Sequence, residues 1–294
     1  MSDTRSTVVA FGWIIIAYCA ALAVAVLAIK ASSLSTLCSV LLADIMATLT
    51  VFLFSFRFRN SSFYDAYWSV APPIILGYWG WVHADAFSQR LLAVSMLVLV
   101  WSVRLTGNWS SGWGGLQDAD WRYVRLKAQL GRFYWPVSLL GVHLMPTLIV
   151  FAGCLPLYVV TESAAGWQVW DSAGLLIGVA AIWLEARADL ELKSFQLARH
   201  SRAELLTTGV WAWCRHPNYL GEIGFWVALA CFALGTGSTA LWSLIGAAAM
   251  IVLFVGVSIP MIEKKLDAGK PGYAEYRAHT PMLLPLGRWT ANRG

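Results

Sequence analysis

The chain has 294 residues, of which 59% are hydrophobic and only 13% are charged, about half the charged fraction of an ordinary soluble domain. A single soluble core of this size cannot hide so much apolar surface, so the composition excludes an ordinary soluble globular protein. The formal net charge of +5 does not indicate a nucleic-acid partner. The basic residues lie in loops between apolar runs, where they suit membrane lipids or an anionic small molecule.

Apolar runs follow one another along the whole chain. Two of them are short, at about 68–84 and 219–235, contain proline or glycine, and are read as re-entrant or strongly tilted helices. The others are long enough to span a bilayer as helices, at about 8–29, 37–56, 88–105, 134–160, 172–190 and 238–262. We therefore predict an all-α integral membrane protein of about eight transmembrane helices, with seven and nine as the outer limits.

The basic residues support this count and give an orientation. With eight helices, both termini and the even-numbered loops share one side of the membrane. Of the 21 lysines and arginines, all except Lys30 and Arg90 then fall on that side. By the positive-inside rule, both termini are expected to face the cytoplasm. No internal repeat or low-complexity linker is present, so we expect one multi-pass membrane domain over 1–294.

The segment 209–222 concentrates polar residues at the start of a predicted helix. Pro217 restrains His216 to an extended conformation, and the helix is expected to start near Asn218 with that side chain as its cap. Arg215 and His216 lie just outside the positive end of this helix, so they are candidates for a phosphate or carboxylate clamp. Glu222, one turn into the helix, is expected to face the interior if it pairs with Arg215 or with another basic residue on the cytoplasmic side.

A second group of motif residues, near the C-terminus, accompanies the segment 209–222. It comprises Glu263-Lys264-Lys265-Leu266, Gly272-Tyr273, Tyr276, Thr280-Pro281 and Pro285. Together the two patterns resemble the C-terminal half of the steroid 5α-reductase superfamily, in particular its bacterial, DUF1295-like branch of membrane reductases. The runs at 61–69, 101–109 and 120–123 fit the same branch, so the resemblance covers about 55–290. Related motifs also occur in sterol reductases and in isoprenylcysteine carboxyl methyltransferases.

The resemblance implies an oxidoreductase of the bacterial inner membrane. Its expected reaction is NADPH-dependent reduction of a carbon–carbon double bond conjugated to a carbonyl, in a 3-oxo-steroid 4-ene or a similar lipophilic enone. The cofactor is expected in the half of the chain at 185–290, with the basic loops near its phosphates. The candidate cofactor-binding residues are Arg104, Arg122, Tyr123, Asp189, Lys193, Arg215, His216, Asn218, Tyr219, Glu222, Lys264, Tyr273 and Tyr276.

The segment 60–133 is the expected substrate and catalytic region. The family's reductases polarise the substrate carbonyl with a polar pair early in the chain, and Asp65 stands where a family glutamate is expected. Tyr67 is the preferred proton donor, with Tyr123 and Tyr64 as alternatives. A buried carboxyl with a raised pKa can donate a proton or orient a tyrosine. The simpler interpretation of Asp65 is a helix cap at the interface.

Other polar residues are left out of the predicted chemistry. Asp44 and His143 lie deep in apolar runs and are expected to pair across the bundle. The histidines form no clustered boxes and nothing resembles a zinc site, so no metal is expected. No Gly-x-Gly-x-x-Gly follows a strand, which excludes a Rossmann-type nicotinamide site.

Two alternative functions stay open. The shared Arg-His-Pro pattern also suits a methyltransferase that uses S-adenosylmethionine, although the runs at 64–69 and 120–123 and the chain length count against it. A transporter or lipid-binding protein without catalysis is the other alternative. The concentration of polar residues on one side of the membrane counts against transport.

Overall fold

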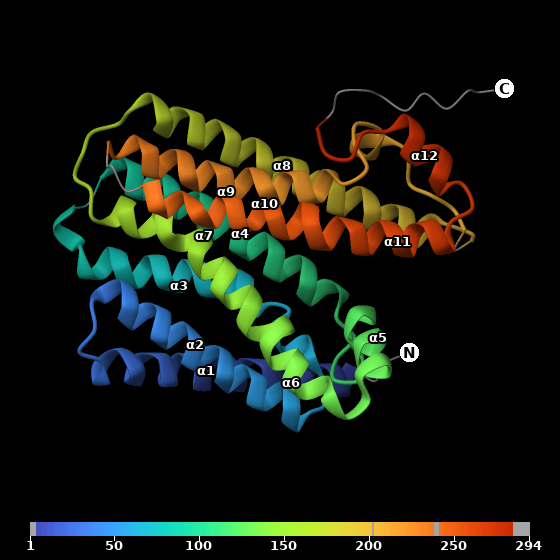
Figure 1. Cartoon of the computed structure of the whole chain (residues 1–294), viewed down its shortest axis with the longest axis horizontal. Coiled ribbons are helices and arrows are strands. Elements are labelled where there is room, and N and C mark those ends of the chain that lie inside the picture. Colours follow the sequence, from blue (N-terminus) through green and yellow to red (C-terminus); the bar gives the residue numbers. More distant parts are fainter. Residues whose placement is uncertain (1–3, 87, 202, 238–240, 285–294) are drawn as a thin grey trace. The chain divides into compact units, whose positions relative to one another are not determined.

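The computed structural model describes residues 4–86, 88–201, 203–237 and 241–284. Pro285, Arg202, Arg288 and Arg293 therefore lie outside the described residues. Within these ranges the regular structure is helical and contains no strand (Figure 1). The α-helices are α1 Thr4–Ala31, α2 Thr36–Arg57, α3 Tyr67–Val82, α4 Gln89–Gly112, α5 Trp121–Leu130, α6 Tyr134–Ser138, α7 Met145–Thr161, α8 Val169–Ala198, α9 Pro217–Gly235, α10 Ile245–Leu253, α11 Ile259–Gly269 and α12 Tyr273–His279.

Seven helical segments of the described chain are long and apolar enough to cross a membrane. They are Thr7–Ala31, Thr36–Arg57, Gln89–Gly112, Trp121–Thr161, Val169–Ala198, Pro217–Gly235 and Leu241–Gly269. The expected eighth helix is present as α3, but its 16 residues are shorter than the length a membrane crossing needs. The prediction of a multi-pass helical membrane protein is thus confirmed, with seven such segments in place of eight.

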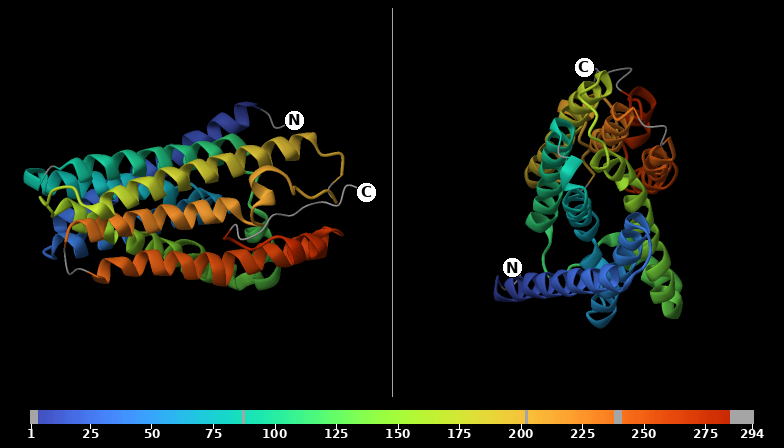
Figure 2. Two further views of the ribbon diagram at one scale, coloured as in Figure 1. Left: turned by 90° about the horizontal axis from the view of Figure 1, so that it is seen from above. Right: turned by 90° about the vertical axis from the view of Figure 1, so that its left-hand side faces the viewer.

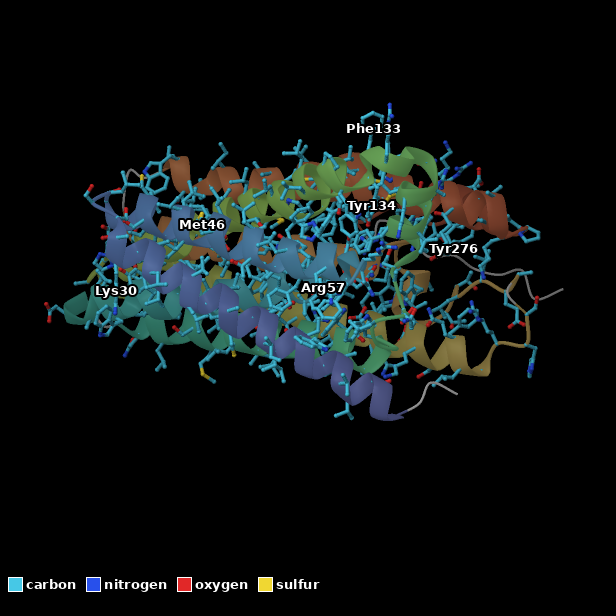
Figure 3. The ribbon with its side chains drawn as sticks, turned by 90° about the horizontal axis from the view of Figure 1, so that it is seen from below. Lys30, Met46, Arg57, Phe133, Tyr134 and Tyr276 are labelled. Atoms are coloured by element: carbon cyan, nitrogen blue, oxygen red, sulfur yellow. The ribbon has the colours of Figure 1, made fainter. Side chains whose placement is uncertain are left out.

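The helices fall into two compact units, and each is described separately. The first unit is drawn from Met1–Phe87 and Val98–Glu162. In it, α1 and α2 form an antiparallel hairpin, and Ser35 caps α2 by accepting a hydrogen bond from the Cys38 amide. Lys30 lies at one end of this unit, whereas Arg57 and Tyr134 lie toward the other (Figure 3).

One long helical stretch of the first unit, Trp121–Thr161, is interrupted twice. Gly131 has a positive φ of 51°, which ends α5 and turns the chain into α6. A π-helical segment, Leu139–Leu144, then separates α6 from α7. Segments of this kind are frequent at functional sites, and this one carries the buried His143.

The second unit is drawn from Ser88–Leu97 and Ser163–Gly294. Its α8 and α9 run side by side over most of their lengths (Figures 1 and 2). The close approach needs Gly221, because a Cβ atom there would lie 2.7 Å from both the Ala181 carbonyl oxygen and the Glu185 Cβ. Helices α11 and α12 complete this unit and bring the C-terminal segment to the start of α9, as the contacts of Arg215 below show.

Candidate functional site

An apolar cavity of about 160 Å³ lies between α1, α2 and α3 of the first unit. Its wall follows α1 from Tyr18 to Ile29 and α3 from Tyr67 to Tyr78, while α2 contributes the segment around Asp44. The remaining lining residues are aliphatic. We call this space the α1–α3 cavity.

Tyr67 and Asp44 form a hydrogen-bonded pair in the wall of the α1–α3 cavity. The Tyr67 hydroxyl donates to Asp44 Oδ1 at 2.7 Å and lies 3.4 Å from the Asp44 carbonyl oxygen. Both residues are buried, at 7% and 6% exposure. The pair forms because α2 and α3 are joined by the short 3₁₀ helix Ser61–Tyr64, which reverses the chain and brings the first residue of α3 beside the middle of α2.

Aromatic neighbours hold the Tyr67 ring in place. Its centroid lies 5.9 Å from that of Tyr18 and 5.4 Å from that of Tyr64. The Tyr18 hydroxyl donates to the Phe63 carbonyl oxygen, whereas the Tyr64 hydroxyl pairs with the Thr147 hydroxyl at 2.8 Å. Of the predicted donors, Tyr67 therefore lines the cavity, and Tyr64 is engaged in the bundle instead.

Asp65 belongs to a different polar pair. The Tyr123 hydroxyl donates to Asp65 Oδ1 at 2.5 Å. Burial raises the pKa of the Asp65 carboxyl, and the hydrogen bond from Tyr123 opposes the rise. The carboxyl stands at the end of the 3₁₀ helix Ser61–Tyr64, so it is not a cap of α3. The partner of the preferred donor Tyr67 is thus Asp44 and not Asp65.

Arg122 contacts protein groups on its own helix. Its guanidinium donates to both carboxylate oxygens of Asp120, at 2.7 and 3.2 Å, and lies over the Tyr123 ring. Arg104 lies on α4, in the part that belongs to the first unit. Whether either residue binds a cofactor phosphate stays a prediction.

His143 is fully buried and pairs across the bundle, as expected for it and for Asp44. Its Nδ1 lies 2.9 Å from the Ser138 carbonyl oxygen, and its Nε2 lies 3.1 Å from the Ser55 hydroxyl. A carbonyl oxygen only accepts, so Nδ1 carries the proton and Nε2 accepts from Ser55. Nε2 thus connects the π-helical segment to α2, whereas Nδ1 bonds the end of α6 on the same helical stretch.

In the second unit, Arg215 attaches the C-terminal segment to the start of α9. Its Nε donates to Glu263 at 2.9 Å, and its Nη1 donates to the carbonyl oxygens of Arg277 and Thr280. The Arg215 amide also donates to the Pro281 carbonyl oxygen. With these contacts made, the guanidinium is occupied by protein groups, which favours a structural role over the predicted phosphate clamp.

His216 shares the same carboxylate. Its Nε2 lies 2.9 Å from Glu263 Oε1, and its ring stacks on that of Tyr219. Burial lowers the pKa of His216, although Glu263 acts in the opposite direction.

The start of α9 differs from the prediction. The helix begins at Pro217 with His216 in the cap position, and no side chain caps it. The expectation of an Asn218 cap is therefore wrong, because proline occupies the first helical position and shifts the start one residue earlier. Glu222 is buried at 3% exposure and accepts a hydrogen bond from Trp226 Nε1 at 2.8 Å, while Arg215 pairs with Glu263.

The other cofactor candidates lie on three elements of the second unit. Asp189 and Lys193 are near the end of α8, and Lys264 is exposed on α11. Tyr273 and Tyr276 are buried on α12, where the Tyr276 hydroxyl donates to the Trp211 carbonyl oxygen. Lys270 makes a similar attachment to the Glu204 carbonyl oxygen at 2.6 Å.

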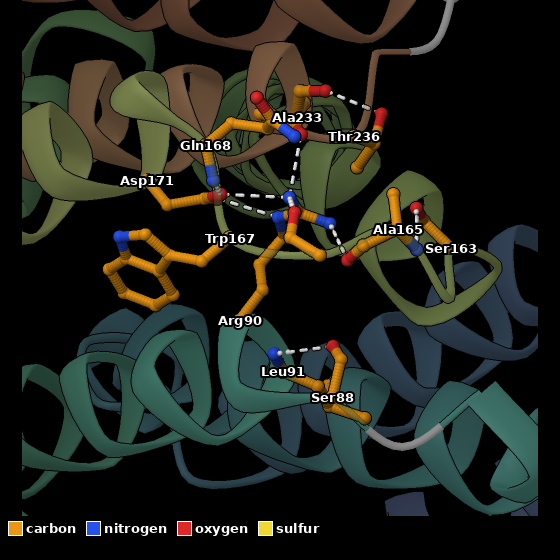
Figure 4. A network of polar contacts seen from close by, with 12 residues as sticks. Ser88, Arg90, Leu91, Ser163, Ala165, Trp167, Gln168, Asp171, Ala233 and Thr236 are labelled. Atoms are coloured by element: carbon orange, nitrogen blue, oxygen red, sulfur yellow. Dashed lines mark hydrogen bonds and ion pairs between the residues drawn. The ribbon is translucent and has the colours of Figure 1, made fainter.

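A buried ion pair that was not predicted from the sequence lies where α8 begins and α9 ends (Figure 4). Arg90 Nε donates to Asp171 Oδ1 at 2.6 Å, and Nη2 donates to Oδ2 at 2.8 Å. The guanidinium also donates to the carbonyl oxygens of Ala165, Gly166 and Gly235. Both side chains are 0% exposed. The sequence could have indicated Asp171, because it stands in a capping position at the start of α8. It could not have indicated Arg90 as the partner, because Arg90 is 81 residues away.

Comparison with known proteins places the chain in a family. Residues 51–280 match the model of DUF1295, described as a protein family of unknown function. A protein of Schizosaccharomyces pombe described as uncharacterized is 25% identical over 258 residues, which cover 77% of this chain and 73% of the relative. No solved structure gives a significant match. Because the family match spans well over half of the sequence, the chain belongs to the steroid 5α-reductase-like DUF1295 family.

Proposed function

We propose that the protein is an NADPH-dependent membrane reductase that saturates a carbon–carbon double bond conjugated to a carbonyl in a lipophilic substrate. The observation that carries the proposal is the Tyr67–Asp44 pair in the wall of the largely apolar α1–α3 cavity. An apolar space with a few convergent polar groups is the usual form of a small-molecule site.

The pair suits a carbonyl oxygen that gains negative charge. The Tyr67 hydroxyl has a single proton, which it donates to Asp44 in this structure. When Asp44 is protonated and donates to the Tyr67 oxygen instead, Tyr67 donates to a substrate carbonyl in the cavity and stabilises the enolate oxygen as it forms. Asp44 holds that hydroxyl in position through the 2.7 Å contact. The surrounding aliphatic wall excludes water and strengthens the interaction. When bound, NADPH supplies the hydride for the β-carbon, and a proton at the α-carbon completes the saturated product.

The second unit contains groups that fit the anionic part of such a cofactor. The N-terminus of α9 has no side-chain cap, and its backbone N–H groups and dipole favour a phosphate. Lys193 and Lys264 are exposed basic residues of the same unit and would hold further phosphate charge. Arg215 does not fit this role, because Glu263 and the C-terminal carbonyl oxygens already take its donors.

A ligand-stabilisation experiment tests the proposal. The detergent-purified protein is titrated with NADPH, NADH and S-adenosylmethionine while its unfolding temperature is followed. Ligand at about a hundred times its Kd stabilises by about 2.7 kcal/mol, so selective stabilisation by NADPH is expected. Stabilisation by S-adenosylmethionine alone would assign the protein to the methyltransferases, and no response to any of the three would favour a non-catalytic role.

Variants separate cofactor binding from chemistry in the same assay. Asn218→Ala and Glu222→Gln are expected to weaken stabilisation by NADPH, since both lie at the start of α9. Tyr67→Phe is expected to keep that stabilisation. Equal responses of all three variants and the wild type would remove these site assignments.

A further inference from the structure

The α1–α3 cavity is elongated. Its lining on α1 extends from Tyr18 to Ile29 and its lining on α3 from Tyr67 to Tyr78, each about 16 Å at 1.5 Å per residue. Tyr18 and Tyr67 are neighbours, with ring centroids 5.9 Å apart, so the two stretches share one end. The cavity therefore runs along the helices and starts at the tyrosines.

Its length suits an extended carbon chain. About 160 Å³ accommodates on the order of ten water-sized groups. An extended carbon chain advances about 1.25 Å per atom, from bonds of about 1.5 Å at about 111°, so about thirteen carbons fill the same length. Four fused rings would place more atoms in a shorter and wider space.

Small residues leave the room for such a chain. Ala21 and Ala25 of α1 and Ala43 and Ala47 of α2 form part of the wall. Within each helix the two alanines are four residues apart, a spacing that puts side chains on one face of a helix. A larger side chain at one of these positions would shorten the cavity.

The rim of the cavity faces outward. Leu22, Val26 and Ile74 line it and are 45%, 42% and 46% exposed. In a membrane-spanning helix such exposed aliphatic side chains contact lipid. The cavity is thus accessible from the hydrocarbon layer.

The depth of the Tyr67–Asp44 pair in the membrane restricts which lipids can reach it. Asp44 lies about 12 Å along α2 from Thr36 and about 20 Å from Arg57 at 1.5 Å per residue. That places it inside a hydrocarbon layer of about 30 Å. Phospholipid ester groups stay with their headgroups at the membrane surface. A single-chain lipid with an uncharged carbonyl end is able to reach this depth.

We propose that the α1–α3 cavity takes one extended hydrocarbon chain, of acyl or isoprenoid type, from the bilayer and places its conjugated carbonyl at Tyr67 and Asp44, in preference to a fused-ring steroid. This inference rests on the proposed reductase function for its chemistry and on the cavity for its specificity. It also concerns a part of the chain outside the family match, because α1 and Asp44 precede residue 51.

The test compares linear enones with a 3-oxo-4-ene steroid as substrates of the full-length protein in nanodiscs with NADPH. Each buried methylene contributes about fourfold in affinity. We expect kcat/KM to rise at least tenfold between enones of about six and about twelve carbons, whose lengths follow from the chain geometry above. The steroid is expected to be at least tenfold poorer than the longer enone. A steroid that matches or exceeds the longer enone would overturn the inference.

Two substitutions of alanine by phenylalanine test whether the chain-length dependence arises in the cavity. Ala25→Phe fills the cavity away from Tyr67 and is expected to remove the advantage of the long enone while the short enone is still reduced. Ala23→Phe makes the same change on the exposed side of α1, outside the lining, and is expected to behave like the wild type. Equal chain-length profiles of the two variants would contradict the assigned cavity.

A binding readout keeps this inference separable from the reductase function. A twelve-carbon enone that carries a photoreactive diazirine at its chain end is cross-linked without NADPH, and the labelled peptides are mapped. Labelling of α1 that Ala25→Phe abolishes and Ala23→Phe retains supports the cavity assignment, even if no enone is reduced. Labelling that both variants retain overturns it, even if short enones are reduced.

Discussion

Two of the buried polar pairs that the structure describes differ in what surrounds them. Arg90 and Asp171, in the second unit, form an ion pair in which the guanidinium also binds three backbone carbonyl oxygens. Asp44 and Tyr67, in the first unit, share one hydrogen bond and line a cavity.

The comparison distinguishes a buried polar group that stabilises the fold from one that is placed to contact a ligand. The contacts of Arg90 connect the start of α4, the start of α8 and the end of α9, and they use the donors of the guanidinium on protein oxygens. The Tyr67 pair faces a space that a ligand is able to enter. A buried charge in a membrane protein is a candidate for function by default, but the cavity, and not the burial, identifies the reactive pair here.

The largest expected effect is on stability. Arg90→Met leaves the Asp171 carboxylate buried without its cation, and removal of one partner of a buried pair costs about 3–5 kcal/mol. The unfolding temperature of the detergent-solubilised variant should fall accordingly. The double variant Arg90→Met with Asp171→Leu should recover a large part of the loss, because no charge is left buried. A single variant as stable as the wild type would show that the network is dispensable.

The next effect is on turnover. Tyr67→Phe removes the hydroxyl that contacts the developing oxyanion and is expected to lower kcat by about a hundredfold to a thousandfold, the usual effect of losing one such donor. The unfolding temperature should fall by less than in Arg90→Met, because Asp44 loses one neutral hydrogen-bond donor and no cation. Tyr64→Phe is the matched control, since its hydroxyl binds Thr147 away from the cavity lining. Similar turnover losses in both variants would refute the assignment of Tyr67.

A smaller effect concerns Asp65. Because burial raises its pKa, the folded state holds this proton more tightly than the unfolded state does. Stability from this group is therefore present at low pH and is lost as pH rises from about 4 through the folded pKa. Asp65→Asn should flatten that part of the stability profile, with turnover reduced less than in Tyr67→Phe. A turnover loss equal to that of Tyr67→Phe would restore Asp65 as the catalytic carboxyl.

The smallest effect is local and involves His216. Its pKa is lowered by burial, so a detached C-terminal segment favours the protonated ring more than the folded state does. The attachment of α12 should weaken as pH falls below about 6.5, the ordinary value for histidine. The protection of residues 276–280 against hydrogen exchange, expressed relative to the intrinsic exchange rate at each pH, should then fall on acidification in the wild type but not in His216→Gln. The same loss of protection in the variant would assign the effect to another group.

Hydropathy was sufficient to predict the helices, because spanning segments need long apolar runs whatever they pack against. Only α3 departs from the expected count, since its 16 residues fall short of a full crossing. The sequence also indicated Tyr67 as a donor, through the motif at 64–73.

The pairings were not predictable from the sequence. Asp44 and Tyr67 are 23 residues apart on different helices, and Arg90 and Asp171 are 81 residues apart. Such contacts depend on how helices rotate against one another, which local pattern does not encode. Asp65 was predicted as the catalytic carboxyl because it stands in a motif, whereas Asp44, which binds Tyr67, lies in an apolar run without a motif. Arg215 stood beside a helix start, but its partner Glu263 lies in a distant segment.

Isotope transfer from NADPH is the most direct test of enone reduction at Tyr67. The purified protein is incubated with NADPH carrying deuterium at its transferable position and with a linear enone, and the product is analysed by mass spectrometry and NMR. We expect a saturated ketone with deuterium at the β-carbon, formed by the wild type and Tyr64→Phe and nearly lost in Tyr67→Phe. Unconsumed NADPH and unchanged enone, or equal product from Tyr67→Phe, would contradict this expectation.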